Sequence, residues 1–179
     1  MPAQSKALGT NRLGLATLFF AALLLQASMA QAADAKKLAI LQLEIEDITN
    51  ANGSLPWHQE SLHRLTDILG ADLAKADIYK IVTQADVDAA TAAFNATSAL
   101  HNCNGCEIDI ARKVGADRVM VAWIFKMSLL VMALHVEIRD VSTGATVYRK
   151  IFDFKGDNEE SWRRASKYMV RELGEAKQY

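Results

Sequence analysis

The sequence is poor in cysteine and proline, with two of each among its 179 residues. It contains no Gly-rich phosphate loop, no His-Glu-x-x-His motif, no calcium-binding loop and no Ser–His–Asp order. The usual sequence signatures of nucleotide-dependent, metal-dependent and serine-dependent enzymes are therefore missing. The formal net charge of −1 also argues against a general nucleic-acid-binding protein, which carries a clear excess of basic residues.

The N-terminus has the order of a secretory signal peptide. Lys6 and Arg12 precede an apolar run over residues 13–25, and small residues follow up to Ala32. The run of about 13 residues is shorter than the ~20 that a membrane-spanning helix needs, and no later run reaches that length. The sequence therefore predicts a signal peptide at residues 1–32, with cleavage after Ala35 as a near alternative.

The mature chain is expected to be a single α/β domain at residues 33–179, located in the periplasm. Loss of residues 1–32 removes two basic residues and no acidic ones, so the formal charge changes from −1 to −3. No cysteine lies near the cleavage point, which argues against a lipid anchor. We expect no transmembrane segment in the mature chain and no nucleic acid as a partner.

Hydrophobic periodicity predicts an alternation of strands and helices. Strands are expected at residues 38–45, 78–82, 119–124, 134–140 and 146–154. Helices are expected at residues 56–76, 83–94 and 107–114 and around 162–173. The strand at 119–124 is apolar on both faces, which is typical of a central position. The order predicts an α/β fold, an α+β sandwich in which helices pack on a mixed sheet of about five strands.

Individual side chains are assigned from the same patterns. Trp123 is expected in the core, and Trp162 is expected to anchor the last helix on the sheet. His58 and His63 are five residues apart on one helix, a poor spacing for a shared metal ion, so both are expected in solvent. Residues 129–133 are apolar on both faces and are expected to be covered.

Cys103-Asn104-Gly105-Cys106 is a C-x-x-C motif at the start of a predicted helix. The positive helix end lowers a thiol pKa, so one interpretation is thiol–disulfide exchange with Cys103 as nucleophile and Cys106 as resolving thiol. However, a polar loop precedes the motif where thioredoxin-type enzymes have a strand. We prefer a structural disulfide, favoured by an oxidising compartment and worth about 2 kcal/mol for so short a loop. An exposed Cys103 sulfur beside a pocket would favour chemistry.

The same segment offers an alternative metal site made of His101, Cys103 and Cys106. A closed tetrahedral zinc site needs four ligands, and this stretch supplies three. Oxidation to the disulfide would remove both thiolates. A c-type haem is excluded because Glu107 stands where C-x-x-C-H requires histidine. We therefore expect no cofactor and no metal, with this set as the alternative.

The last predicted helix carries a basic stripe opposite its apolar face. Arg163, Arg164, Lys167 and Arg171 form it, and it is a possible interaction site for an acidic partner or a phospholipid surface. A solvated helix face explains the same pattern. The acidic residues at 157, 159 and 160 are explained by their favourable position at the positive end of the helix.

Four segments together carry a resemblance to known proteins: LAILQLEIED, NCNGCEIDIARKVGAD, the strand pair ending IRDVSTG, and FKGDNEESWRRASKYM. As a set they resemble a small bacterial family of secreted proteins of unknown function. More distantly, the first strand and the succession that ends in DVSTG are similar to the amino-terminal domain of TolB and to the curli-secretion lipoprotein. That similarity implies an α/β sandwich that works in envelope assembly or protein contacts, and it implies no catalytic residues.

We interpret the chain as a non-enzymatic periplasmic accessory or interaction protein of the bacterial envelope, with a structural C-x-x-C disulfide and an envelope protein as its partner. Two alternatives stay open. One is a thiol–disulfide oxidoreductase that uses Cys103 and Cys106, and the other is a soluble carrier of a metal or a small ligand.

Overall fold

The computed structural model describes residues 35–49, 55–94 and 99–176, so the predicted signal peptide at residues 1–32 lies outside the described residues. The strands are β1 (Lys37–Ile40), β2 (Glu44–Asp47), β3 (Lys80–Ile81), β4 (Arg118–Lys126), β5 (Met132–Asp140) and β6 (Thr146–Phe154). The helices are α2 (Pro56–Lys75), α3 (Gln84–Ala92), α4 (Cys106–Lys113) and α5 (Glu159–Ala176), with a 3-10 turn η1 at Leu100–Asn102. Among the described residues, no helix combines the length and the apolarity needed to cross a membrane.

The strands form one mixed sheet in the order β3-β1-β4-β5-β6, with β2 also paired to β4. Strands β1 and β2 run parallel to β4, whereas β4, β5 and β6 are antiparallel neighbours. This confirms the predicted α/β fold and the central place of β4. The sheet has six strands because the predicted strand at 38–45 is divided into β1 and β2.

The division of the first strand has a local cause. Ile40 pairs with Met120 on β4, and Glu44 pairs with Trp123. The first strand advances four positions between these two pairs, whereas β4 advances only three. The first strand therefore has one extra residue, which cannot join the ladder. The N–H of Leu43 in this break donates to the hydroxyl of Thr66 on α2 at 3.1 Å instead.

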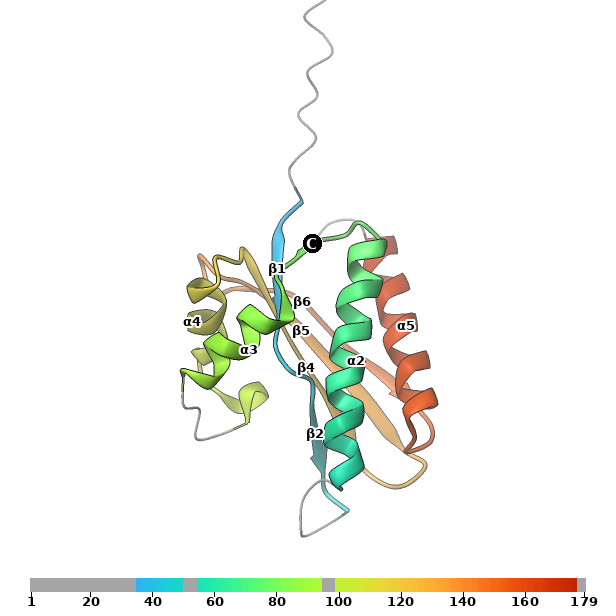
Figure 1. The fold of residues 1–179 in the computed structure, drawn as a ribbon. Helices are drawn as coiled ribbons and strands as arrows, with labels where there is room; N and C mark the ends of the chain where they lie inside the picture. The colour runs from blue at the N-terminus through green and yellow to red at the C-terminus, as the bar shows by residue number, and fades with distance from the viewer. Residues whose placement is uncertain (1–34, 50–54, 95–98, 177–179) are drawn as a thin grey trace, which may run out of the picture. The chain divides into compact units, whose positions relative to one another are not determined.

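The two faces of the sheet support two separate cores (Figure 1). On one face α2 and α5 lie side by side and bury apolar residues at helical spacing: Leu62, Leu65, Leu69, Leu73, Trp162, Met169 and Leu173. On the other face α3 and α4 contribute Val87, Ala90, Ile108, Ile110 and Ala111. Alternate residues of β4 project into the two cores, as the period of a strand requires.

The two tryptophan predictions have different outcomes. Trp162 is 1% exposed and fixes α5 on the sheet, as predicted. Trp123 is only half-buried at the margin of the second core, so its assignment to the interior is wrong. The short helices α3 and α4 end before they cover this part of β4. As a result, the Trp123 ring lines an open pocket.

The prediction that residues 129–133 are covered is also wrong for the first part of this stretch. Leu129 and Leu130 are 70% and 68% exposed. They lie in the turn between β4 and β5, where the hydroxyl of Ser128 accepts the N–H groups of Leu130 and Val131. These backbone N–H groups are bonded within the turn, and the carbonyl of Leu129 accepts the N–H of Asp157 at 3.1 Å, so the backbone of the turn is held while its apolar side chains stay outside.

A closed charge network joins the ends of β2, β4 and α2 to the loop before α5. The Nζ of Lys126 lies 2.8 Å from Asp47 and 2.7 Å from Asp157, and each of these side chains is at most 4% exposed. Burial alone would raise the pKa of Asp47, but hydrogen bonds from Lys126 and Thr49 together hold it below its ordinary value. Asp157 is therefore an internal ion-pair partner rather than a solvated helix-end charge.

His58 belongs to this network, so its expected place in solvent is wrong. The imidazole is 0% exposed. Its Nδ1 accepts the N–H of Leu55 at 3.0 Å, which leaves Nε2 to donate to Asp157 at 3.3 Å. His63, by contrast, is exposed as predicted.

Candidate functional site

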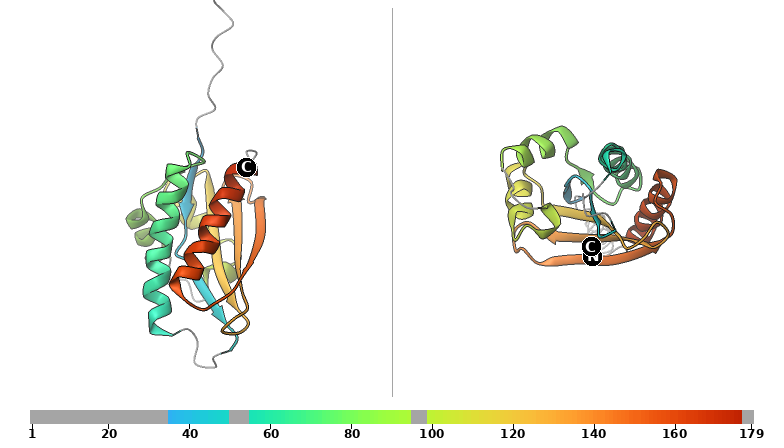
Figure 2. Two further views of the ribbon diagram at one scale, coloured as in Figure 1. Left: turned by 90° about the vertical axis from the view of Figure 1, so that its right-hand side faces the viewer. Right: turned by 90° about the horizontal axis from the view of Figure 1, so that it is seen from below.

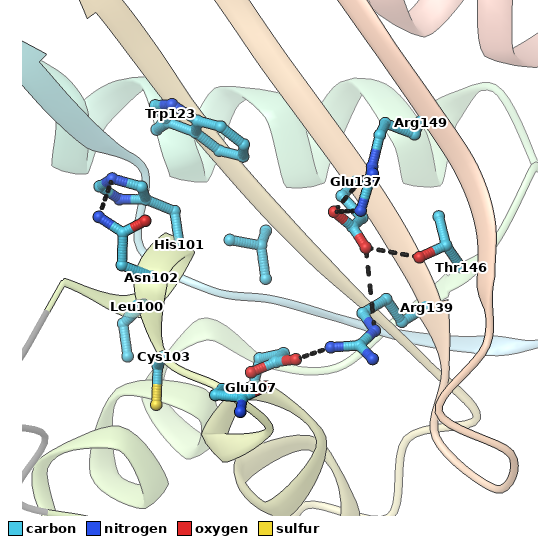
Figure 3. A pocket seen from close by; sticks show the side chains of 12 residues that line it. Leu100, His101, Asn102, Cys103, Glu107, Trp123, Glu137, Arg139, Thr146 and Arg149 are labelled. Atoms are coloured by element: carbon cyan, nitrogen blue, oxygen red, sulfur yellow. Dashed lines mark hydrogen bonds and ion pairs between the residues drawn. The ribbon is translucent and has the colours of Figure 1, made fainter.

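The half-covered face of the sheet holds a pocket of about 290 Å³ (Figure 3). Its floor is made of β4, β5 and β6, and one wall is made of η1 and the loop that leads to α4. The lining is polar, with two arginines and two glutamates from α4, β5 and β6 beside the ring of Trp123. The pocket therefore brings the C-x-x-C segment and the adjacent Glu107 next to charged residues of β5 and β6 that lie at least thirty positions further along the sequence.

Glu44, on β2, fixes the η1 wall of this pocket. Its carboxylate accepts the backbone N–H groups of Leu100 at 2.8 Å and His101 at 3.0 Å. The same carboxylate lies 2.6 Å from Nδ1 of His101, which donates to it. Three hydrogen bonds to one charged group hold the turn in a single position, so the wall is preformed.

Three rings are stacked beside the pocket, and of these Trp123 and His101 line it whereas His135 does not. The imidazole of His101 lies 5.0 Å from the ring of Trp123, and the imidazole of His135 lies 4.6 Å from it, both nearly parallel. Burial lowers the pKa of His135, against the opposing effect of the carboxylates of Glu46 and Asp153. The stack places a rigid aromatic surface at one end of the pocket.

The charged side chains of the pocket neutralise one another. Glu107 pairs with Arg139, whose guanidinium also donates to the carbonyl of Gly144 at 2.8 Å. Glu137 pairs with Arg149 at 2.7 Å because the two residues are direct neighbours in the β5–β6 register. The pocket thus offers donors and acceptors in balanced pairs.

The two cysteines lie at the edge of the pocket. Cys103 is half-buried and lines it, whereas Cys106, the first residue of α4, is 4% exposed. Their sulfurs are joined as a disulfide, with the Cα atoms 5.6 Å apart. Gly105 between them has φ +105°, a left-handed conformation that glycine adopts without strain. The tight turn therefore depends on glycine at this position.

The structure does not bring the alternative metal set of His101, Cys103 and Cys106 together. The imidazole of His101 is engaged by Glu44 and by the ring stack. Instead, potential ligand atoms of Cys103, Cys106 and Glu107 lie within 4.8 Å of one another. Glu107 is in the first turn of α4, as predicted, but its carboxylate is buried and also accepts the N–H of Gly105 at 3.1 Å.

The basic stripe of α5 lies away from this pocket, on the helix that covers the opposite face. Its four residues, Arg163, Arg164, Lys167 and Arg171, are exposed. Arg164 pairs with Glu160, and the guanidinium of Arg171 lies 4.7 Å from the ring centre of Tyr168. The stripe stays a predicted interaction site.

No curated protein matches the sequence. A lipoprotein of Neisseria meningitidis, GNA1162, has a similar fold, with a TM-score of 0.53 and 12% identity over 77% of this chain and 96% of that chain. LpoB of Escherichia coli aligns with a TM-score of 0.48 and 20% identity. The alignment covers 68% of this chain and only 56% of the LpoB chain. TolB of Acinetobacter baumannii aligns with a TM-score of 0.44 and 17% identity over 81% of this chain and 29% of that chain.

At these identities, the likeness to GNA1162 describes the fold and nothing more. A family model gives a firmer assignment, since it matches residues 36–173 and confirms the resemblance to an uncharacterised family that the sequence carries. The chain belongs to the family DUF3280, described as "Protein of unknown function (DUF2380)".

Proposed function

We propose that this protein is a non-enzymatic accessory protein of the bacterial envelope and that it binds a protein partner through the pocket beside the disulfide. In this proposal residues 1–32 are a cleaved signal peptide, and residues 33–179 act as one domain in the periplasm. The observation that carries the proposal is the pairing of charges in the pocket. Glu107 with Arg139, Glu137 with Arg149 and His101 with Glu44 are mutually satisfied.

Paired charges suit binding better than acid–base catalysis. A general base needs a free lone pair that faces the substrate, and a nucleophile needs a neighbouring base. Here the carboxylates accept from arginine or from backbone N–H groups. A partner with amide and hydroxyl groups can share these arginines and glutamates at the open side of the pocket. Because Glu44 holds the wall in place, little ordering is needed on binding.

The disulfide has a structural role in this proposal. Its two cysteines tie the pocket wall to the first turn of α4, and Cys106 packs in the second core. The half-buried Cys103 is the part of the pair that a partner would touch. In this role the disulfide stabilises the wall of the binding pocket and catalyses no reaction.

In-cell photo-crosslinking tests the proposal. A photoreactive residue at Asn104, which is exposed on the pocket wall, is expected to capture a specific envelope protein. The matched control is the same residue at His63, which is exposed on α2 across the sheet and is expected to capture none. Equal capture from both positions, or none from Asn104, contradicts a partner at the pocket.

Export is tested separately on the same preparations. The intact mass of the protein from the periplasmic fraction is expected to correspond to a chain that begins at Ala33. Retention of residues 1–32 would overturn the localisation, and with it the oxidising environment on which the disulfide assignment depends.

A second candidate function, thiol–disulfide exchange, is favoured by one observation. Cys103 lines the pocket while Cys106 is buried, and the Glu107 carboxylate lies within 4.8 Å of both sulfurs. The reduction potential separates the two functions, because structural disulfides lie below about −300 mV and catalytic ones well above that value. Catalysed reduction of a test disulfide, with a Cys103 pKa near or below ~7, would establish the enzyme.

The third alternative is a carrier of a metal or a small ligand, and its metal form requires reduced thiols, because a disulfide offers no thiolate. Metal analysis of protein purified with and without a reductant decides it. Stoichiometric zinc or copper in the reduced sample only would assign the Cys103, Cys106 and Glu107 group to a redox-dependent metal site.

A further inference from the structure

Strand β6 is an edge strand of the sheet that the described residues form, and β3 lies at the other end of the strand order. Strand β6 pairs with β5 on one side, and it is the last strand of the order β3-β1-β4-β5-β6. The left view of Figure 2 shows the orange strand β6 at the margin of the sheet, and no further strand of the described residues pairs with it. It is nine residues long, and an edge of that length is an open template for another strand.

The side chains of β6 divide into two sets. Tyr148 and Phe152 are buried against α5, and they fix the strand in the first core. Arg149, Ile151 and Asp153 alternate with them, point to the other face, and are all exposed. Ile151 is 55% exposed, which places a large apolar side chain at the middle of an unpaired edge. The order on this face is basic, apolar, acidic.

We propose that β6 pairs antiparallel with β6 of a second copy of this chain, about a twofold axis at Ile151. In that register the two Ile151 side chains meet at the centre. Arg149 of each copy then lies opposite Asp153 of the other copy, so the interface contains two opposite-charge pairs. Directly opposed residues of an antiparallel pair have Cβ atoms about 4.5–5.5 Å apart, close enough for these contacts.

The charge order selects this register against its neighbours. A twofold axis at Arg149 would place that arginine opposite itself, and an axis at Asp153 would oppose two aspartates. A shift by one residue would exchange the exposed face with the face buried under α5. A parallel arrangement in register would set like charges side by side. Among pairings of two identical strands, the antiparallel pair centred on Ile151 matches both charge and burial.

The surroundings of the strand are compatible with an added partner. Asp153 forms no ion pair among the described residues, so its carboxylate is available, and Arg149 is 67% exposed even in its pair with Glu137. Two hollows of about 440 and 340 Å³ lie along β6 beside α5, on either side of the strand's midpoint. The helix therefore leaves the edge accessible.

The pairing would also join the two candidate binding sites. Arg149 lines the pocket described above, so Asp153 of the second copy would approach the rim of that pocket. The two pockets would then open on the same side of one continuous sheet. The paired arginine would still donate to Glu137, because a guanidinium has five N–H groups.

Cysteine crosslinking tests the twofold axis in the full mature chain. With Ile151→Cys, the two introduced thiols face each other, and mild oxidation is expected to give a covalent dimer in most of the protein. Lys155→Cys is the matched control. It is equally exposed, but in the proposed register it lies roughly 27 Å from its own equivalent, eight residues further along the ladder. Equal crosslinking of the two variants would overturn the register.

Charge reversal tests the pairs. Asp153→Arg and Arg149→Asp, each alone, place like charges opposite each other, and both variants are expected to be monomers by sedimentation velocity where the wild type is a dimer. An equimolar mixture of the two variants restores opposite charges at both positions and is expected to form a heterodimer. Lys113→Asp, a charge reversal at an exposed position of α4, is expected to leave the wild-type dimer intact.

Thermal melts test whether all variants fold. The changes are not expected to prevent folding, because the residues are exposed. A wild type that stays monomeric over the whole accessible concentration range overturns the proposal, and leaves β6 free for a strand from another protein. A wild-type dimer that survives Asp153→Arg overturns it as well, since the contact would then lie elsewhere on the molecule.

Discussion

The two faces of the sheet contain the same kinds of residues, tryptophans and ion pairs, but differ in how far these residues are exposed to solvent. Under α2 and α5, Trp162 is 1% exposed and Lys126 is bound between two buried aspartates. Beside α3 and α4, Trp123 is half-buried, and Arg149 pairs with Glu137 while 67% of its side chain is exposed. The first set holds the fold together, and the second set is available to a ligand. The extent to which helices cover each face of the sheet, rather than the type of residue, therefore distinguishes the buried core from the candidate site.

Helix length explains the difference in coverage. Helices α2 and α5 have 20 and 18 residues, whereas α3 and α4 have nine and eight. At 1.5 Å per residue the first pair extends about 30 Å and the second about 12 Å, while a nine-residue strand extends about 30 Å. The long helices therefore cover the strands from end to end. The short helices cover β1 and part of β4 and leave the pocket open over β5 and β6.

The largest loss of stability is expected when Trp162 is replaced, and replacement of Trp123 is the comparison. Trp162→Ala should lower the free energy of unfolding by about 3–5 kcal/mol, because a fully buried ring leaves a cavity between α5 and the sheet. Trp123→Ala should cost clearly less, since solvent already reaches that ring. Urea unfolding of both variants measures the two values. Equal losses would mean that the two faces are equally closed and would remove the basis for the comparison.

Breaking the ion pairs of the covered face should likewise cost more stability than breaking those of the open face. Lys126→Met leaves Asp47 and Asp157 buried without their cation and should cost about 3–5 kcal/mol. Arg149→Met breaks an exposed pair and should cost about 1 kcal/mol or less. Chemical unfolding at neutral pH compares them. A small loss in Lys126→Met would show that water enters the first network, contrary to its exposure of at most 4%.

The disulfide should contribute an intermediate amount. Cys103→Ser with Cys106→Ser should fold and lose about 2 kcal/mol, the value expected for a closed four-residue loop. Partner capture at the pocket should persist, although more weakly because the wall is less constrained. The wild type in reductant is the control, and it should unfold at the same urea concentration as the double variant. A double variant that fails to fold would mean that the disulfide is essential to the fold and not a local crosslink.

The contrast between the faces was only partly predictable from the sequence. The alternation in β5 and the turn before β6 are local signals, and both strands and the polar face of His135, Glu137 and Arg139 follow from them. The amphipathic pattern of α5 likewise predicts the burial of Trp162. Patterns within ten or fifteen residues therefore recover the elements and their inner faces.

Contacts between distant residues were not predictable in this way. His58 reads as a solvated helix residue, yet its partner Asp157 lies 99 positions away. Glu44 reads as a strand-end charge, yet it fixes the pocket wall 56 and 57 positions further on. Hydrophobic periodicity contains no information about such pairs. The same limit explains Trp123, because a strand that is apolar on both faces does not reveal where the covering helix ends.

The smallest effect concerns His135 in the open region. Burial lowers the pKa of this imidazole, with His101 acting in the same direction and the carboxylates of Glu46 and Asp153 opposing it. A base with a depressed folded pKa favours the folded state above its unfolded pKa of about 6.5, and this contribution is lost as the pH falls through the folded pKa. The wild type should therefore lose stability as the pH falls from neutral past about 6.5.

His135→Phe should make that loss smaller, because phenylalanine preserves the stack on Trp123 and removes the titrating group. Urea unfolding at a series of pH values measures the slope, and the imidazole resonances report the pKa of His135 directly. His63→Gln, which removes an exposed imidazole from α2, is the matched comparison for the loss of one titrating imidazole. An imidazole of His135 that titrates above its ordinary value would mean that the carboxylates outweigh burial. The surroundings of His135 would then be dominated by these two charges rather than by its burial.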